Sequence, residues 1–125
     1  RTTLEVSQRE LHIILGHSHP NLVHYRHFKG PNQFRLYMEY VTGGTIEALA
    51  LSLGPLPEME VAAVTDQVLQ GLDFLHSKSI VHLDIKGTNL PISLEGCVKI
   101  CELGSARPLE NSYLYSCFCV LLAHA

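Results

Sequence analysis

The chain has little charge and no long apolar run. Asp, Glu, Lys and Arg make up 17% of its 125 residues, and the formal net charge is −3. This balance gives no electrostatic reason to bind nucleic acid or an anionic membrane surface. No apolar stretch reaches the roughly 18 residues of a transmembrane helix, and the first residues are too polar for a signal peptide. We therefore expect no nucleic-acid partner, no membrane span and a cytoplasmic location.

Cysteine is sparse and confined to the last third of the chain, at Cys97, Cys101, Cys117 and Cys119. Reduced thiols are the expected state of such residues in a cytoplasmic protein. Histidine is more frequent, with eight residues, but only His17 and His19 are close neighbours. A structural zinc site needs convergent ligands, so we do not predict one.

Hydrophobic residues make up 46% of the chain, enough for the core of at most one domain. Apolar residues at helical spacing predict helices at 4–15 and 58–76, and a short helix is expected at 45–52 after a glycine break. Alternation predicts strands, and their expected ranges are 22–28, 33–40, 92–94 and 97–101. This mixture of elements indicates an α+β fold.

Residues 80–90, with the sequence IVHLDIKGTNL, place an acid, a base and an amide in an apolar frame. Buried neighbours can pin such a loop so that Asp84, Lys86 and Asn89 converge on one point. The stretch resembles the catalytic loop of protein kinases, H-R-D-x-x-x-x-N, with Leu83 where that pattern has arginine.

The flanks resemble the same family in order and spacing. Glu10 followed by His19-Pro20-Asn21 is similar to helix C, whose glutamate forms an ion pair. Residues 33–40 resemble the fifth strand, with Met38 as gatekeeper, and Glu39-Tyr40-Val41 resembles the hinge that binds adenine. Glu102-Leu103-Gly104 takes the place of D-F-G. Without these flanks, Glu10 would be interpreted as a solvated helix charge and Met38 as core filler of an ordinary hairpin.

The resemblance implies a partial protein-kinase-like fold. It contains helix C, the hairpin of the fourth and fifth strands, the hinge, helices D and E, the catalytic loop, and the seventh and eighth strands. The glycine-rich loop and most of the large lobe are not found in these residues. Residues 1–41 are expected to be the remnant of the small lobe and 42–107 the start of the large lobe. Residues 108–125 form an apolar tail that is unlike the family and would be an adhesive patch unless it refolds onto the core.

The same resemblance implies an ATP- and Mg²⁺-dependent serine/threonine kinase, most similar to the MAP kinase kinase kinase group. Its substrate would be a protein such as a MAP kinase kinase. Asp84 would accept the proton of the substrate hydroxyl, and Lys86 would offset charge on the γ-phosphate. Asn89 and Glu102 would hold Mg²⁺. The residues implied for ATP binding are Glu10, Met38, Glu39, Val41 and Pro91.

Several departures from the family pattern limit this interpretation. Glu102 replaces an aspartate and reaches about 1.5 Å further, the length of one C–C bond, whereas Mg²⁺ demands near-octahedral geometry. Pro91 stands under the expected adenine position, where we predict a distorted floor. No lysine precedes Glu10. We therefore expect this chain to be inactive by itself.

Three functions stay open at this point, and so does the oligomeric state. The first is a serine/threonine kinase of which this chain is a part. The second is a pseudokinase-like fragment that binds a protein partner. The third is a truncated product without a stable fold, because uncovered lobe surfaces forfeit apolar burial while the chain still loses conformational entropy.

Overall fold

The computed structural model describes residues 12–13, 15–31 and 34–109, so Glu10 and residues 110–125 lie outside it. Its named elements, in chain order, are the strands β1 (Tyr25–Lys29) and β2 (Phe34–Met38), the helices α2 (Ile46–Leu53) and α3 (Glu58–Ser77), and the strands β3 (Ile80–Val81) and β4 (Arg107–Pro108). Single 3-10 turns occupy Gly87–Asn89 and Leu103–Ser105. The mixture of helices and small sheets agrees with the predicted α+β class.

The long helix α3 matches its sequence prediction to within one residue. Pro57 precedes its first residue, and Glu58 and Glu60 lie in its first turn, where negative charge is favoured by the helix dipole. The shorter helix α2 begins at Thr45, whose hydroxyl accepts the Ala48 N–H at 3.2 Å. Within the described ranges, no helix combines the length and hydrophobicity needed to cross a membrane.

The core lies between α3 and the segments on either side of it in the chain. Its fully buried members include Leu75 of α3 together with Val98 and Ile100 of the later segment. The close approach requires Gly71, because a Cβ there would meet Ile100 Cδ1 at 2.8 Å and the Asn21 carbonyl at 3.0 Å. The buried Asn21 joins the same region by donating from Nδ2 to the Val98 carbonyl at 2.9 Å.

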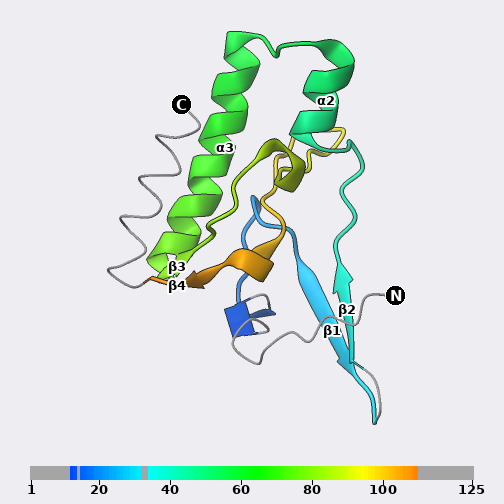
Figure 1. Cartoon of the computed structure of the whole chain (residues 1–125), viewed down its shortest axis with the longest axis vertical. Coiled ribbons are helices and arrows are strands. Elements are labelled where there is room, and N and C mark those ends of the chain that lie inside the picture. The colour runs from blue at the N-terminus through cyan, green and yellow to red at the C-terminus, as the bar shows by residue number, and fades with distance from the viewer. Residues whose placement is uncertain (1–11, 14, 32–33, 110–125) are drawn as a thin grey trace.

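The antiparallel hairpin of β1 and β2 projects from the rest of the chain (Figure 1). Both strands are shorter than predicted. The alternation of β2 suggested a buried face, yet all five of its residues are exposed, and Met38 is 54% exposed. Core filler is therefore the wrong interpretation of Met38, because no described element covers this part of the hairpin.

The two short strands predicted at 92–94 and 97–101 are absent as strands from the described chain. Single bridges take their place, pairing Ile92 with Val98 and Leu22 with Ile100. The turn between them forms as expected, and Gly96 adopts φ 84° in it. Each bridge joins a single pair of residues, and the two bridges involve different segments, so no continuous β-ladder develops.

Candidate catalytic loop and hinge

The loop after β3 is anchored by a buried histidine. His82 is 1% exposed, and its Nε2 lies 2.8 Å from the Cys101 carbonyl oxygen. Its Nδ1 accepts the backbone N–H of Asp84 at 3.1 Å. Accepting at Nδ1 and donating at Nε2 requires the neutral ring with its hydrogen on Nε2. Burial, the largest influence, lowers the pKa of His82 and so favours this neutral form.

The side chain of Asn89 fixes Asp84 from within the same loop. Asn89 is 5% exposed and donates from Nδ2 to Asp84 Oδ2 at 3.0 Å and to the Asp84 carbonyl at 2.9 Å. Both Nδ2 hydrogens are thereby used, which leaves Oδ1 as the free acceptor of this amide. The carboxylate therefore has a set position in this loop.

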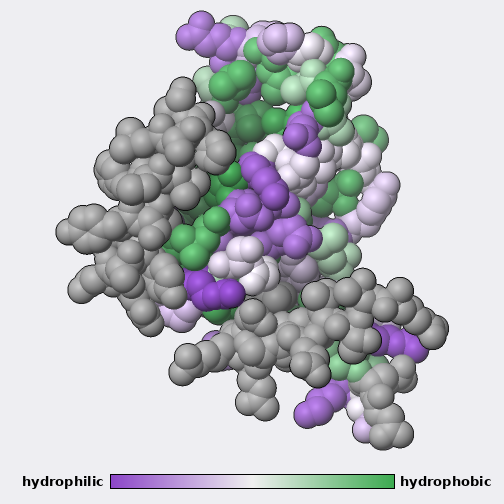
Figure 2. Space-filling model, viewed as in Figure 1, coloured by the Kyte–Doolittle hydropathy of each residue, from purple (hydrophilic) through white to green (hydrophobic). Residues whose placement is uncertain are grey.

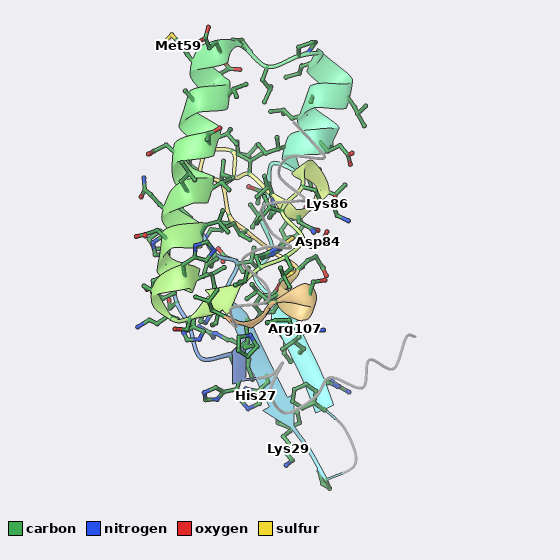
Figure 3. The ribbon with its side chains drawn as sticks, turned by 60° about the vertical axis from the view of Figure 1, so that its left-hand side comes forward. His27, Lys29, Met59, Asp84, Lys86 and Arg107 are labelled. Atoms are coloured by element: carbon green, nitrogen blue, oxygen red, sulfur yellow. The ribbon has the colours of Figure 1, made fainter. Side chains whose placement is uncertain are left out.

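Lys86 completes the group that the sequence predicted. Its Nζ lies 3.5 Å from Asp84 Oδ2, and the two side chains are 57% and 39% exposed. An ion pair this exposed is weak, so the ammonium group can leave Asp84 for another anion at little cost. Figure 3 shows Asp84 and Lys86 on the segment that follows β3, well separated from His27 and Lys29 on the hairpin.

Backbone strain occurs on both sides of the His82–Cys101 hydrogen bond. Leu83, next to His82, has φ 67°, and Glu102, next to Cys101, has φ 60°. Non-glycine residues in this left-handed region cost roughly 1–3 kcal/mol, and such positions concentrate at functional sites. The fold therefore maintains an unfavourable conformation at the two chain segments that meet in this loop.

The segment that carries Glu102 is joined to the loop at Asn89. The N–H of Cys101 donates to the Asn89 carbonyl at 3.0 Å, which brings the following residue next to the loop. The Glu102 N–H donates to the Tyr25 hydroxyl at 3.3 Å, and burial raises the pKa of Tyr25 to about 12. The carboxylate of Glu102 itself has no hydrogen-bond partner among the described residues.

Asn89 and Glu102 carry oxygen atoms of the kind that could hold a magnesium ion together with phosphate. Mg²⁺ is usually held in proteins by one or two carboxylates together with substrate phosphates and water. Asn89 Oδ1 and the Glu102 carboxylate supply protein oxygens of this kind. No group of three or more His, Cys, Asp and Glu side chains that could hold a metal occurs among the described residues, so a closed site made only by protein is not formed there.

In the predicted hinge, the Glu39 side chain makes structural contacts, whereas two backbone groups have no hydrogen-bond partner among the described residues. Glu39 pairs with Lys99 at 3.0 Å and accepts the His24 N–H at 3.0 Å. Burial by itself would raise the pKa of Glu39, but these two contacts outweigh it and lower the pKa. The Glu39 carbonyl and the Val41 N–H make no hydrogen bond to any described residue. Both remain available to an adenine-like edge.

Pro91 does not distort the backbone as we expected. It pairs with Thr45, and the ladder is closed on both sides by Ile46 N–H to Leu90 O and Ile92 N–H to Gly44 O, each at 2.9 Å. Proline has no backbone N–H to donate, but its nitrogen points away from Thr45, so this pairing loses no hydrogen bond. Its own carbonyl accepts the Lys99 N–H at 2.9 Å.

A hollow of the described chain lies away from this loop. It has a volume of about 750 Å³ and is lined by residues 18–20 and by side chains of β1 and β2, with Glu39 and Lys99 at one wall. Asp84, Asn89 and Glu102 do not line it. The predicted catalytic group therefore lies outside this hollow. Figure 2 shows a hydrophilic area in the middle of the face that it draws.

The structure thus brings Asp84, Lys86 and Asn89 together and joins the segment of Glu102 to their loop. Met38, Glu39 and Val41 lie in the predicted hinge. Glu10 falls outside the described residues. Sequence reasoning gave no role to His82, although it stands at the histidine of the H-R-D pattern. That position was the available signal, and its burial and two hydrogen bonds appear only in the folded chain.

A loop that presents a hydrogen-bonded carboxylate, an exposed ammonium group and a buried amide suits phosphoryl transfer, which depends on positioning and charge neutralisation. Residues 1–123 match the protein kinase domain. The chain belongs to this family. The match runs through residues 108–123, which belong to the tail that we expected to be unlike the family.

Among curated proteins, the chain is similar to MAP kinase kinase kinases and to a serine/threonine-protein kinase. The chain is 33% identical over 115 residues to mitogen-activated protein kinase kinase kinase MST11 of Pyricularia oryzae, covering 91% of this chain and 13% of that protein. It is 36% identical over 105 residues to the kinase ANP1 of Arabidopsis thaliana, covering 83% and 16%. It is 34% identical over 111 residues to serine/threonine-protein kinase STE11 of Saccharomyces cerevisiae, covering 88% and 16%. The chain therefore spans only a small part of each relative.

Proposed function

We propose that the chain is part of an ATP- and Mg²⁺-dependent serine/threonine kinase of the MAP kinase kinase kinase group. The observation that carries this proposal is the double hydrogen bond from Asn89 to Asp84, with Lys86 beside it. A carboxylate held in this way can orient a hydroxyl and receive its proton. The names of the relatives support the group, and they support a MAP kinase kinase as the protein substrate.

The same proposal assigns the described helices, strands and loop to elements of the protein kinase family. The β1–β2 hairpin corresponds to the fourth and fifth strands, α2 and α3 to helices D and E, and residues 82–89 to the catalytic loop. The boundary between the lobes then falls near residue 41, in the hinge. The open Glu39 carbonyl and Val41 N–H are placed to pair with adenine, and Pro91 forms the floor beneath it.

Each described residue of the site has a separate task. Asp84 accepts the proton of the substrate hydroxyl, and Lys86 exchanges its weak pairing with Asp84 for the transferring phosphoryl group. Asn89 and Glu102 would hold Mg²⁺, which when bound would neutralise charge on the phosphates. His82 ties the Asp84 and Glu102 segments together, so that the carboxylates keep a fixed relationship.

A pseudokinase-like binding role is the second candidate, and Glu102 is the observation that favours it. Its carboxylate is one bond longer than that of the usual aspartate, and this would weaken binding of Mg·ATP. We therefore expect the 125 residues alone to transfer almost no phosphate.

A segment exchange tests whether the site is competent. The stretch of STE11 that matches this chain would be replaced by residues 16–109, and transfer of labelled phosphate from ATP to a MAP kinase kinase would be measured. We expect activity that falls about 100-fold or more in Asp84→Asn, because general-base catalysis contributes factors of 10² to 10⁴. Thr88→Ser, a conservative change in the same loop, is the matched control.

The outcomes separate the two candidates. Activity that depends on Asp84 supports the kinase proposal. No activity in the exchange protein, even with Glu102→Asp, overturns it, and the binding role then takes its place. Strong transfer by the 125-residue chain alone would contradict our expectation that further parts are needed.

A further inference from the structure

Tyr25 connects the β1–β2 hairpin to the segment that carries Glu102. Its ring is half-buried and packs against the core cluster that includes Leu75 and Ile100. At the end of the ring, the hydroxyl oxygen accepts the Glu102 N–H at 3.3 Å, across 77 positions of sequence. Because close packing restricts the ring, the hydroxyl oxygen is held at one place beside the Glu102 backbone.

Glu102 depends on such contacts because of its backbone conformation. It has φ 60° and ψ 58°, in the left-handed region that residues with a side chain rarely adopt. It also precedes the 3-10 turn Leu103–Ser105, to which it gives no side-chain cap. A residue in this region persists only where the surrounding structure over-determines it. The contacts that hold the Glu102 backbone therefore decide where its carboxylate points.

Two different elements supply these contacts. The catalytic loop holds the preceding residue, since the Cys101 N–H donates to the Asn89 carbonyl at 3.0 Å. The hairpin holds Glu102 itself through Tyr25. Burial raises the pKa of Tyr25 to about 12, although the N–H groups of Glu102 and Leu103 both lower it. The hydroxyl thus faces the peptide groups on both sides of the Glu102 Cα atom and stays a neutral acceptor at physiological pH.

We propose that Tyr25 is a positioning residue, whose hydroxyl holds the Glu102 backbone in its left-handed conformation and so directs the Glu102 carboxylate relative to Asn89. The hairpin is thereby coupled to the candidate magnesium ligands. The role of the hydroxyl toward the backbone stands on the contacts alone, whereas its consequence for Mg²⁺ rests on the proposed function. Glu102 is exposed, so water can replace a missing hydroxyl as acceptor. Loss of the hydroxyl therefore changes geometry more than stability.

Hydrogen exchange in the full chain tests the backbone role. Tyr25→Phe keeps the ring and removes only the acceptor. Tyr37→Phe is the matched control, because Tyr37 is 51% exposed on β2 and its hydroxyl has no hydrogen-bond partner among the described residues. We expect the Glu102 N–H to exchange about fivefold faster in Tyr25→Phe alone. The Lys99 N–H, which donates to the Pro91 carbonyl, should exchange equally in all proteins and reports an intact fold.

Nucleotide binding tests the consequence for Mg²⁺ without requiring turnover. In the STE11 protein that carries residues 16–109, binding of a non-hydrolysable ATP analogue would be titrated by calorimetry at increasing Mg²⁺ concentration. We expect Tyr25→Phe to raise the Mg²⁺ concentration for half-maximal binding about tenfold, since groups that orient a metal ligand contribute at least this much to metal affinity. Tyr37→Phe should leave that concentration unchanged.

The two measurements fail independently. Equal hydrogen exchange at Glu102 in Tyr25→Phe and Tyr37→Phe would overturn the proposal, whatever the nucleotide titration gives. Faster hydrogen exchange with an unchanged Mg²⁺ dependence would show that Tyr25 does not direct the carboxylate. Faster hydrogen exchange together with no nucleotide binding by the unchanged exchange protein would support the backbone role and place the failure in the proposed function.

Discussion

The His82 ring and the Cys101 carbonyl, 19 positions apart in sequence, meet at 2.8 Å in the interior of the fold. This bond joins the loop that carries Asp84 to the segment that carries Glu102. Because the ring also accepts the Asp84 N–H, it must stay neutral to keep both contacts. The relative position of the two carboxylates therefore depends on the protonation of one buried histidine.

Acidification should destabilise the chain through this histidine. Burial lowers the pKa of His82 below its ordinary value of 6.5, so the unfolded chain binds more protons as the pH falls through that value. The contribution to stability is complete above about pH 6.5 and decreases below it. Urea titration at about pH 7.5 and about pH 5.5 should give a lower free energy of unfolding at the acidic pH.

Two variants test which histidine causes the pH dependence of stability. His82→Phe should flatten it and also lower the stability at neutral pH by about 1–3 kcal/mol, because the Cys101 carbonyl loses its partner. His17, whose pKa is also lowered by burial and by Lys78, contributes in the same direction. His17→Gln should therefore leave a measurable slope, and an unchanged slope in His82→Phe would contradict the assignment.

Gly71→Ala should destabilise the chain although alanine favours helices. The new Cβ would meet Ile100 Cδ1 at 2.8 Å and the Asn21 carbonyl at 3.0 Å. Overpacking of this kind costs about 1–3 kcal/mol, which exceeds the gain of about 1 kcal/mol in helix propensity. Thermal unfolding measures the difference. Gly104→Ala is the matched control, because no atom lies within 4 Å of its added Cβ, and its effect should be small.

Asn21→Ala should also lower stability, by about 1–3 kcal/mol, because it removes a buried donor and leaves an acceptor unpaired. The bond concerned runs from Asn21 Nδ2 to the Val98 carbonyl at 2.9 Å. Urea titration checks the value. Gln70→Ala removes an exposed side-chain bond to Asp66 and should cost at most about 0.5 kcal/mol. Equal losses of stability in the two variants would mean that the buried Asn21 bond contributes no more than the exposed Gln70 bond.

Glu102→Asp should increase phosphoryl transfer in the exchange protein. The change shortens the side chain by about 1.5 Å. If Asn89 and this carboxylate hold Mg²⁺ as we propose, the shorter side chain would suit the ion without a shift of the strained backbone. We expect a gain of about tenfold, equivalent to about 1.4 kcal/mol in the barrier. Glu95→Asp, at an exposed turn, should have no effect. Unchanged or lower activity would show that the longer carboxylate is not limiting.

Much of the local structure could be predicted from the sequence. The helix α3 follows from apolar spacing and its flanking residues, and the turn near Gly96 follows from its glycine. The hairpin was expected too, but its ends and its buried face were not predicted correctly. Alternation in β2 describes what the strand offers for burial, whereas burial itself needs a covering element, and the described residues provide none for Met38.

The sequence by itself determined the chemistry of the site. The order and spacing of Asp84, Lys86, Asn89 and Glu102 are features of the chain, and their resemblance to the protein kinase pattern implies phosphoryl transfer. Only the tertiary structure decided how these groups are held. The bonds of His82 to Cys101 and of Cys101 to Asn89 connect residues distant in sequence, and such contacts exist only after the core around Leu75 and Ile100 has formed, because burial removes the water that would otherwise satisfy the same groups.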